Sequence, residues 1–261
     1  MEKINKPCKY FVSGQECKFK EKCKFQHIKN KKPKNTVDFE PLKRNVDMKI
    51  VVDTTNNFLK KNMNDLDIVL ATNLFKEFKE YEIYNKLVEE INTCGIDLNI
   101  LLKHWHGNNK GLSGTHYIAD DSLKWKENCN MFNYVVNKVV NFFDMEPKTT
   151  RFNWYRSGDE WKPLHHDASK VKPHIAKTQN ITVAVSFGQS RDIILQHANK
   201  QDIYISIESN DGECYAFSHT INCLWKHGVH IASDIERKKI DGRISIIIWG
   251  YKKDLNCNNS N

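Results

Sequence analysis

The run WKPLHHDASK, residues 161–170, places two histidines and an aspartate side by side, and these residue types bind metal ions. If the run is a β-strand, its side chains alternate between two faces, so His165 and Asp167 point the same way and His166 points the other. The first two would then supply two ligands on one side of a metal ion. A third imidazole would complete the two-histidine, one-carboxylate set that binds non-haem Fe(II) and leaves three positions open.

Later histidines are the candidates for that third ligand: His174, His197, His219, His227 and His230. We favour His227, because its segment CLWKHGVH is followed by the apolar run RISIIIWG, which begins at Arg243. An arginine that opens a buried strand is costly unless an anion pairs with it, and a dicarboxylate cosubstrate would supply that anion. His165, Asp167, His227 and Arg243 therefore form one coherent set. The competing interpretation is a surface strand with unrelated polar residues.

A second set of metal-binding residue types lies near the N-terminus. Cys8, Cys17, Cys23 and His27 follow the spacing C-x8-C-x5-C-x3-H. Three thiolates and one imidazole can complete the tetrahedral shell of a zinc ion, and so short a segment has too little core to fold without one. We therefore expect a small zinc-stabilised finger. The alternative is a lysine-rich arm with scattered thiols.

The same N-terminal segment combines aromatic rings with positive charge. Residues 1–35 contain 11 lysines and three glutamates, whereas acidic and basic side chains balance in the rest of the chain. Tyr10, Phe11, Phe19 and Phe25 lie among these lysines. Lysines attract phosphates and rings stack on unpaired bases, so the pattern favours single-stranded nucleic acid, with one or two rings facing a base. A solvated tail is the alternative.

The composition suits one main domain and a small appendage. The chain has 261 residues, of which 39% are hydrophobic and 11% aromatic. It contains no apolar run of signal-peptide or membrane-spanning length, so we expect a soluble intracellular monomer, in the cytoplasm or the nucleus. In such a compartment the eight cysteines indicate metal ligands and free thiols rather than disulfides.

The elements that position the histidine motif are helices followed by strands. Residues 74–91 (LFKEFKEYEIYNKLVEEI) and 131–143 (MFNYVVNKVVNFF) carry apolar side chains at helical spacing. After Thr150 the chain changes to short runs rich in β-branched and aromatic residues, separated by turn residues. This pattern predicts an α+β fold, with a β-sandwich or jelly roll and helices against one face.

Five segments resemble the AlkB-like family of Fe(II)- and 2-oxoglutarate-dependent dioxygenases, over about residues 70–251. They are FNWYRSGDEWKPLHHD, TVAVSFG, DGECYAF, CLWKHGVH and RISIIIWG, in the family's order and at similar intervals. The resemblance implies a double-stranded β-helix, or jelly roll, and an iron site formed by His165, Asp167 and His227. It also implies a 2-oxoglutarate pocket formed by Arg243, Asn153, Tyr155 and Ser245, with Arg243 on the far carboxylate.

The chain departs from that family at two positions. The family usually has a second arginine six residues after the first, where this chain has Trp249, and this leaves the cosubstrate geometry open. Two residues after the metal aspartate the family often has an acidic or polar residue that reads the base. This chain has Ser169 there, so a base preference does not transfer.

The N-terminal segment KPCKYFVSGQECKFKEKCKFQH resembles the CCCH zinc-finger family. Members of that family commonly bind single-stranded RNA, and the resemblance implies the same partner here. The aromatic residue after the first cysteine, Gly14 and Phe25 match the family. Lys20 departs from it, because the family often has a glycine in that loop.

We therefore predict four regions: a CCCH zinc finger in residues 1–30, a linker and extension in 31–65, an AlkB-like dioxygenase domain in 66–254, and a polar tail in 255–261. The predicted cofactors are Fe(II), 2-oxoglutarate and Zn(II). The predicted activity is oxidative demethylation of N-methylated bases in RNA or other single-stranded nucleic acid. A protein hydroxylase tethered to ribonucleoproteins and a catalytically inactive RNA-binding protein are the alternatives.

Overall fold

The computed structural model describes residues 4–12, 16–27, 48–56, 63–106, 113–232 and 242–255. Most of the predicted linker and nearly all of the predicted tail lie outside these residues. The chain divides into two compact units, Met1–Asn45 and Val46–Asn261. No helix in the described residues is long and apolar enough to cross a membrane.

The first unit contains β1 (Ile4–Pro7), α1 (Lys9–Val12), the 3-10 turn η1 (Lys20–Lys22) and β2 (Phe25–Gln26). The strands of the second unit are β3 (Lys49–Asp53), β4 (Asp67–Ala71), β5 (Leu102–His106), β6 (Ser113–Asp120), β7 (Glu146–Tyr155), β8 (Lys162–His165), β9 (Ile181–Gly188), β10 (Arg191–His197), β11 (Tyr204–Ser209), β12 (Cys214–Ser218), β13 (Trp225–Val229) and β14 (Arg243–Tyr251). Its helices are α2 (Glu82–Thr93), α3 (Leu98–Leu101), α4 (Asn130–Phe143), α5 (Pro173–Ala176) and α6 (His219–Leu224), with 3-10 turns η3 (Lys126–Asn128) and η4 (Ala168–Lys170).

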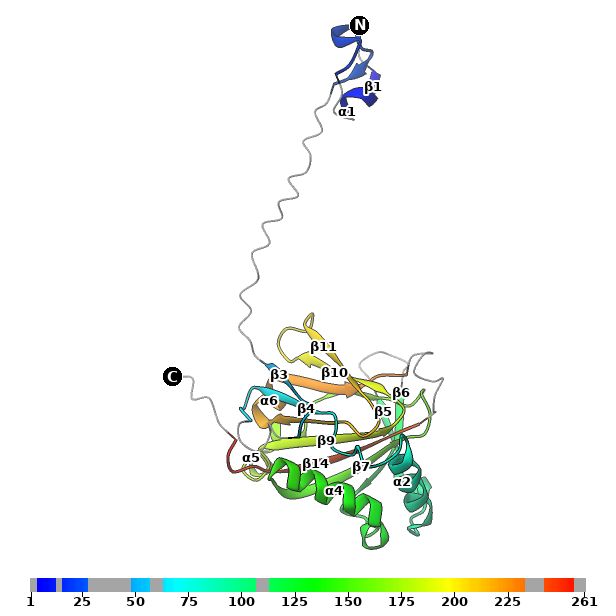
Figure 1. Ribbon diagram of the computed structural model, residues 1–261, viewed down its shortest axis with the longest axis vertical. Coiled ribbons are helices and arrows are strands. Elements are labelled where there is room, and N and C mark those ends of the chain that lie inside the picture. Colours follow the sequence, from blue (N-terminus) through cyan, green and yellow to red (C-terminus); the bar gives the residue numbers. More distant parts are fainter. Residues whose placement is uncertain are drawn as a thin grey trace. The chain divides into compact units, whose positions relative to one another are not determined.

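The second unit is a mixed α and β structure in three layers. An eight-stranded sheet in the order β3-β4-β12-β9-β14-β7-β6-β5 forms the middle layer, and a four-stranded sheet in the order β11-β10-β13-β8 lies on one side of it. Helices α2 and α4 lie on the other side, as Figure 1 shows. One apolar cluster packs between the helices and the large sheet, and a second packs between the two sheets. The histidine motif belongs to the small sheet.

Both predicted helices are confirmed, although the first is shorter than its pattern. Helix α2 begins at Glu82 rather than near residue 74, because Tyr81 has a left-handed backbone (φ 64°). The Glu82 carboxylate accepts a hydrogen bond from the Lys79 backbone N–H at 3.2 Å, which fixes this start. Helix α4 has no capping side chain of its own; Glu90 of α2 accepts bonds from the Met131 and Phe132 backbone N–H groups.

Strand β3 lies in a stretch where the sequence indicates no element. It pairs in parallel with β4 at the edge of the large sheet. Its Ile50 and Val52 side chains are exposed, so the strand lacks the alternation between buried apolar and exposed polar residues that normally reveals one.

The register of the large sheet builds the floor beneath the small sheet. Every second residue of β14 faces the small sheet: Arg243, Ser245, Ile247 and Trp249. The last three of these line the cavity that also contains the histidine motif. Intervening isoleucines of β14 belong to the cluster beneath the helices. On β7 the paired residues are Tyr155, Asn153, Arg151 and Thr149. The polar faces of β7 and β14 are thereby turned toward the histidines.

Candidate metal centres and the pockets beside them

The structure brings His165, Asp167 and His227 together. His165 is the last residue of β8 and pairs in register with His227 of β13. Asp167 lies two residues farther on in extended backbone, so it returns to the face of His165 although the strand has ended. One possible ligand atom from each residue lies within 4.8 Å of the other two. This group is compatible with metal binding.

The contacts of Asp167 leave one carboxylate oxygen directed at the histidines. Its Oδ2 accepts a hydrogen bond from the Thr182 hydroxyl at 3.0 Å, and its Oδ1 lies 3.6 Å from His227 Nε2. The second distance is too long for a hydrogen bond, yet both atoms can reach one ion. Burial would raise the pKa of Asp167, but the His227 and His165 imidazoles outweigh burial and hold that pKa well below its usual range. The carboxyl is therefore ionised, the form that metal binding requires.

A hydrogen-bonded clamp fixes the loop that carries Asp167. Asn222 of α6 accepts a hydrogen bond from the Asp167 backbone N–H at 2.7 Å and donates one to the Ser169 hydroxyl at 3.0 Å. Ser169 is buried, so its side chain serves this clamp. His166 is not one of the three clustered residues, and its Nδ1 lies 2.5 Å from the Asn222 backbone carbonyl oxygen.

The residues expected to bind 2-oxoglutarate surround the same site. Asn153, Tyr155 and Ser245 line the cavity that contains the three ligand residues, while Arg243 lies one alternation beyond Ser245 on β14. Asn153 donates to the Ser245 carbonyl at 3.2 Å and lies 3.2 Å from His116 Nε2. Burial raises the pKa of Tyr155 to about 12, so its hydroxyl is a neutral donor.

Arg243 is a fully buried cation with spare hydrogen-bonding capacity. Its Nη2 donates to the Ser186 hydroxyl, whereas Nε and Nη1 have no hydrogen-bond partner among the described residues. Its guanidinium carbon lies 5.9 Å from the centre of the Tyr155 ring. Orphaned N–H groups on a buried guanidinium are expensive unless an anion completes the site.

A second, more open groove lies on the other side of the ligand residues. Four residues line both this outer groove and the inner cavity that contains the three ligand residues, so they form the boundary between the two: Lys162, His165, Asp167 and Trp249. Arg151 belongs to the outer groove alone, and its guanidinium carbon lies 5.1 Å from the centre of the Trp249 ring. The sequence assigns no role to Lys162, Arg151 or Thr182. Arg151 and Thr182 reach the site from β7 and β9, far from the histidine motif, whereas Lys162 lies within the motif's own strand but is a residue type that is usually exposed.

The four residues of the expected zinc site also converge. Ligand atoms of Cys8, Cys17, Cys23 and His27 all lie within 4.8 Å of one another, and all three cysteines are buried. The Cys8 and Cys17 sulfurs are 3.6 Å apart, close to the edge of about 3.8 Å that a tetrahedron with zinc–sulfur bonds of about 2.3 Å would have. The Nε2 atom of His27 is buried beside them. This group too is compatible with metal binding.

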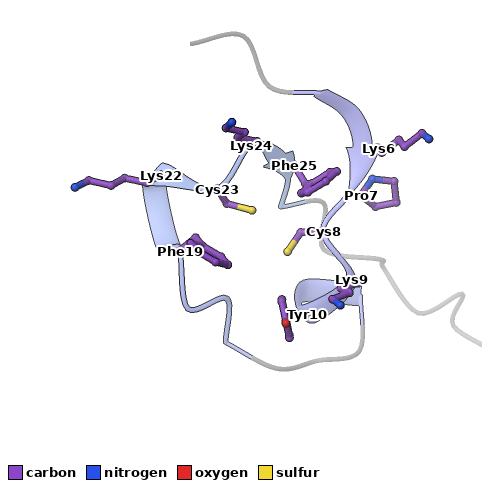
Figure 2. Close-up of a pocket in the computed structure, with 10 residues that line it drawn as sticks. All are labelled: Lys6, Pro7, Cys8, Lys9, Tyr10, Phe19, Lys22, Cys23, Lys24 and Phe25. Atoms are coloured by element: carbon purple, nitrogen blue, oxygen red, sulfur yellow. The ribbon is translucent and has the colours of Figure 1, made fainter.

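The aromatic residues of the finger divide into packed and exposed rings. Tyr10 packs against the three cysteines, whereas Phe19 and Phe25 are 63% and 40% exposed. Figure 2 shows these rings around Cys8 and Cys23, with the lysine side chains of Lys6 and Lys22 directed outward. The Phe11 side chain lies outside the described part of the chain.

The chain was compared with protein families, curated proteins and solved structures. No protein-family model and no curated protein matches the chain. Among solved structures, the chain is similar to one described as the structure of OsALKBH1, an AlkB homologue from rice, with 16% sequence identity and a TM-score of 0.44. The similarity covers 70% of this chain and 96% of that one.

Proposed function

We propose that this protein is an Fe(II)- and 2-oxoglutarate-dependent dioxygenase that removes methyl groups from N-methylated bases in single-stranded RNA. One observation carries the proposal: a two-histidine, one-carboxylate group shares a cavity with Asn153, Tyr155 and Ser245, next to a buried arginine with orphaned N–H groups. Metal ligands and an anion site in one enclosed place are what a metal-dependent enzyme with an anionic cosubstrate needs.

His165, Asp167 and His227 would hold Fe(II), and the fit is chemical as well as spatial. Two imidazoles and one carboxylate form the donor set of non-haem Fe(II) oxygenases. Thr182 and Asn222 hold the carboxylate and its backbone in place, which is how outer contacts tune a metal site. When bound, Fe(II) and 2-oxoglutarate would supply the oxidation: one oxygen atom enters a substrate C–H bond, and succinate and carbon dioxide leave.

Arg243 would hold one carboxylate of 2-oxoglutarate, with Tyr155 and Asn153 lining its path to the metal. A guanidinium recognises a carboxylate through paired, charge-assisted hydrogen bonds, and the buried position strengthens them. The enclosed cavity keeps water away from the reacting atoms. If the oxidised carbon is an N-methyl group, the hydroxymethyl product breaks down to formaldehyde and the unmethylated base.

The substrate would approach through the outer groove, which reaches His165 and Asp167 from the side away from the inner cavity. A base must leave its stack to reach such a site, and this is easiest on a single strand. In the N-terminal unit, zinc held by Cys8, Cys17, Cys23 and His27 would fix Phe19 and Phe25 as stacking surfaces. The surrounding lysines would attract phosphates.

At the level of architecture we propose a double-stranded β-helix formed by the two facing sheets, preceded by a zinc finger in residues 1–30 and a linker and extension in 31–65. The dioxygenase domain would span residues 66–254, with β3 of the extension added to the edge of its large sheet and a short tail after it. The protein would act as a monomer.

The proposal is tested by incubating the iron-loaded full chain with 2-oxoglutarate and pooled cellular RNA, and measuring succinate, formaldehyde and modified nucleosides by mass spectrometry. We expect RNA to stimulate succinate formation while one methylated nucleoside disappears and formaldehyde forms in equal amount. Succinate without a change in any nucleoside would exclude demethylation and support the protein hydroxylase. Absence of succinate from iron-loaded protein would support the inactive RNA-binding protein.

A further inference from the structure

We propose that Lys162 is a second cationic anchor for 2-oxoglutarate and holds the 2-oxo acid end of the molecule beside the metal, while Arg243 holds the far carboxylate. This inference rests on the proposed function and adds a residue that neither the motif nor the resemblance indicates. It concerns how this chain recognises its cosubstrate.

Lys162 lies beside the metal ligands, at the start of the strand that carries His165. It is the first residue of β8, three residues before His165, and its side chain is buried. It lines the inner cavity together with all three ligand residues, and it also borders the outer groove. A buried ammonium costs free energy, and it is found where charged groups or a ligand compensate for the lost water.

The two cations meet the site from different elements. Lys162 lines the inner cavity together with His165, Asp167 and His227 and lies three residues before His165 on β8, so it belongs to the metal end of the cavity. Arg243 lies on β14, one alternation beyond Ser245, and its guanidinium carbon is 5.9 Å from the centre of the Tyr155 ring.

The shape of the ligand matches this arrangement. 2-Oxoglutarate has a carboxylate at each end of a short chain, and the carboxylate next to its keto group lies at the metal. Lys162 would bind the carboxylate next to the keto group, and Arg243 would bind the carboxylate at the far end. Trp249 supplies no charge at the metal end, so the ammonium of Lys162 takes that place from a different strand.

The test is a calorimetric titration of the full chain with Mn(II) in place of Fe(II), so that binding is measured without turnover. Two ligands are compared, 2-oxoglutarate and 2-oxobutyrate, which keeps the 2-oxo acid end and lacks the far carboxylate. We expect Lys162→Met to weaken both ligands at least tenfold and to leave their affinity ratio unchanged. Arg243→Met should instead collapse that ratio toward one, because it removes the contact that the two ligands do not share.

Three further variants give the controls. Lys162→Arg should bind 2-oxoglutarate within about fivefold of the wild type, and Lys162→Gln repeats the charge removal with a polar side chain. Lys226→Met removes an ammonium from β13 that faces away from His227 by strand alternation, and it should change neither affinity. Mn(II) affinity and the unfolding midpoint check folding.

The outcomes separate this inference from the proposed function. If the wild type binds Mn(II) but not 2-oxoglutarate, both fail. If the wild type binds 2-oxoglutarate and Lys162→Met and Lys162→Gln bind it within threefold of the wild type, only the role of Lys162 is overturned. A collapse of the affinity ratio in Lys162→Met would place Lys162 at the far carboxylate and also overturn the inference.

Discussion

At the scale of single residues, the site depends on contacts that fix the ligands as much as on the ligands themselves. Thr182 occupies one oxygen of Asp167 and leaves the other for the metal. Outer contacts of this kind commonly change metal affinity by about 10–100-fold. Such residues carry no signature in the sequence, because Thr182 is fifteen positions from its partner and belongs to another sheet.

Thr182→Val should therefore weaken Mn(II) binding about tenfold, because the freed carboxylate oxygen can rotate away from the histidines. Isothermal titration of the metal into the full chain measures this. Thr182→Ser keeps the hydroxyl and should restore the affinity to within about threefold. Equal affinities for the valine variant and the wild type would show that the Thr182 contact does not position Asp167.

Arg151 is the residue that we expect to contact the substrate rather than the cosubstrate. Its guanidinium stacks on Trp249 in the outer groove, and its Nε has no hydrogen-bond partner among the described residues. Arg151→Met should lower kcat/KM for RNA at least tenfold, about 1.4 kcal/mol, and leave the succinate formed without RNA unchanged. A parallel loss of both rates would place Arg151 in the cosubstrate site instead.

At the scale of residues, the sequence predicts the three metal ligands and the buried arginine, but not the side chains around them. Strand alternation and the cost of burying Arg243 are enough to select His165, Asp167 and Arg243, and the structure brings His165 and Asp167 to His227. Arg151 and Thr182 escape such reasoning, because they reach the site through the pairing and packing of strands that lie far from the histidine motif in the sequence. Lys162 lies in the motif's own strand, but its burial is visible only in the structure.

At the scale of elements, the two helices behind the large sheet are joined by hydrogen bonds from the start of one to a side chain of the other. Glu90 of α2 caps the start of α4, so it joins the two helices that cover the back of the large sheet. An N-terminal cap of this kind contributes about 1 kcal/mol.

Glu90→Gln should lower the free energy of unfolding by about 1 kcal/mol and the Tm by about 2–4 °C for a unit of this size. Differential scanning calorimetry measures the shift, and Glu89→Gln is the matched control, because Glu89 is its neighbour on the same helix and caps nothing on α4. If both variants shift the Tm equally, the effect comes from net charge and not from the cap.

The sequence predicts the long helices and the later strands better than the first strands of the large sheet. Strong periodicity reveals α2 and α4, and the β-rich character after Thr150 corresponds to β7–β14. Strands β3 and β4 are harder to predict, because β3 exposes its apolar side chains and pairs in parallel at a sheet edge. Pairing with a distant strand, and not local pattern, determines that such a segment is a strand.

At the scale of the whole molecule, the chain consists of two units with different sources of stability. The Val46–Asn261 unit has two extensive apolar clusters, whereas the described core of the Met1–Asn45 unit is three cysteines with Tyr10 packed on them. A core this small would need the zinc ion that we propose for it in order to fold. The charge pattern of the sequence already separates the two units, because the excess of lysine lies in residues 1–35.

Cys8→Ser should therefore unfold the finger and leave the larger unit intact. We expect RNA affinity, measured by fluorescence anisotropy, to fall at least tenfold, while Mn(II) binding at the triad and the main thermal transition do not change. Cys223→Ser is the control, because Cys223 lies in the larger unit and outside both metal clusters. An unchanged RNA affinity in Cys8→Ser would contradict a role for the finger in RNA binding.

The central claim is that His165, Asp167 and His227 form a working iron site, and the most direct measurement is the conversion of 2-oxoglutarate to succinate by the iron-loaded full chain. We predict turnover in the wild type and loss of at least 100-fold, about 2.7 kcal/mol, in Asp167→Ala. The control is His174→Ala, which removes an exposed histidine outside both metal clusters and should keep turnover close to that of the wild type. Comparable turnover in Asp167→Ala and the wild type, or none in the wild type, would contradict it.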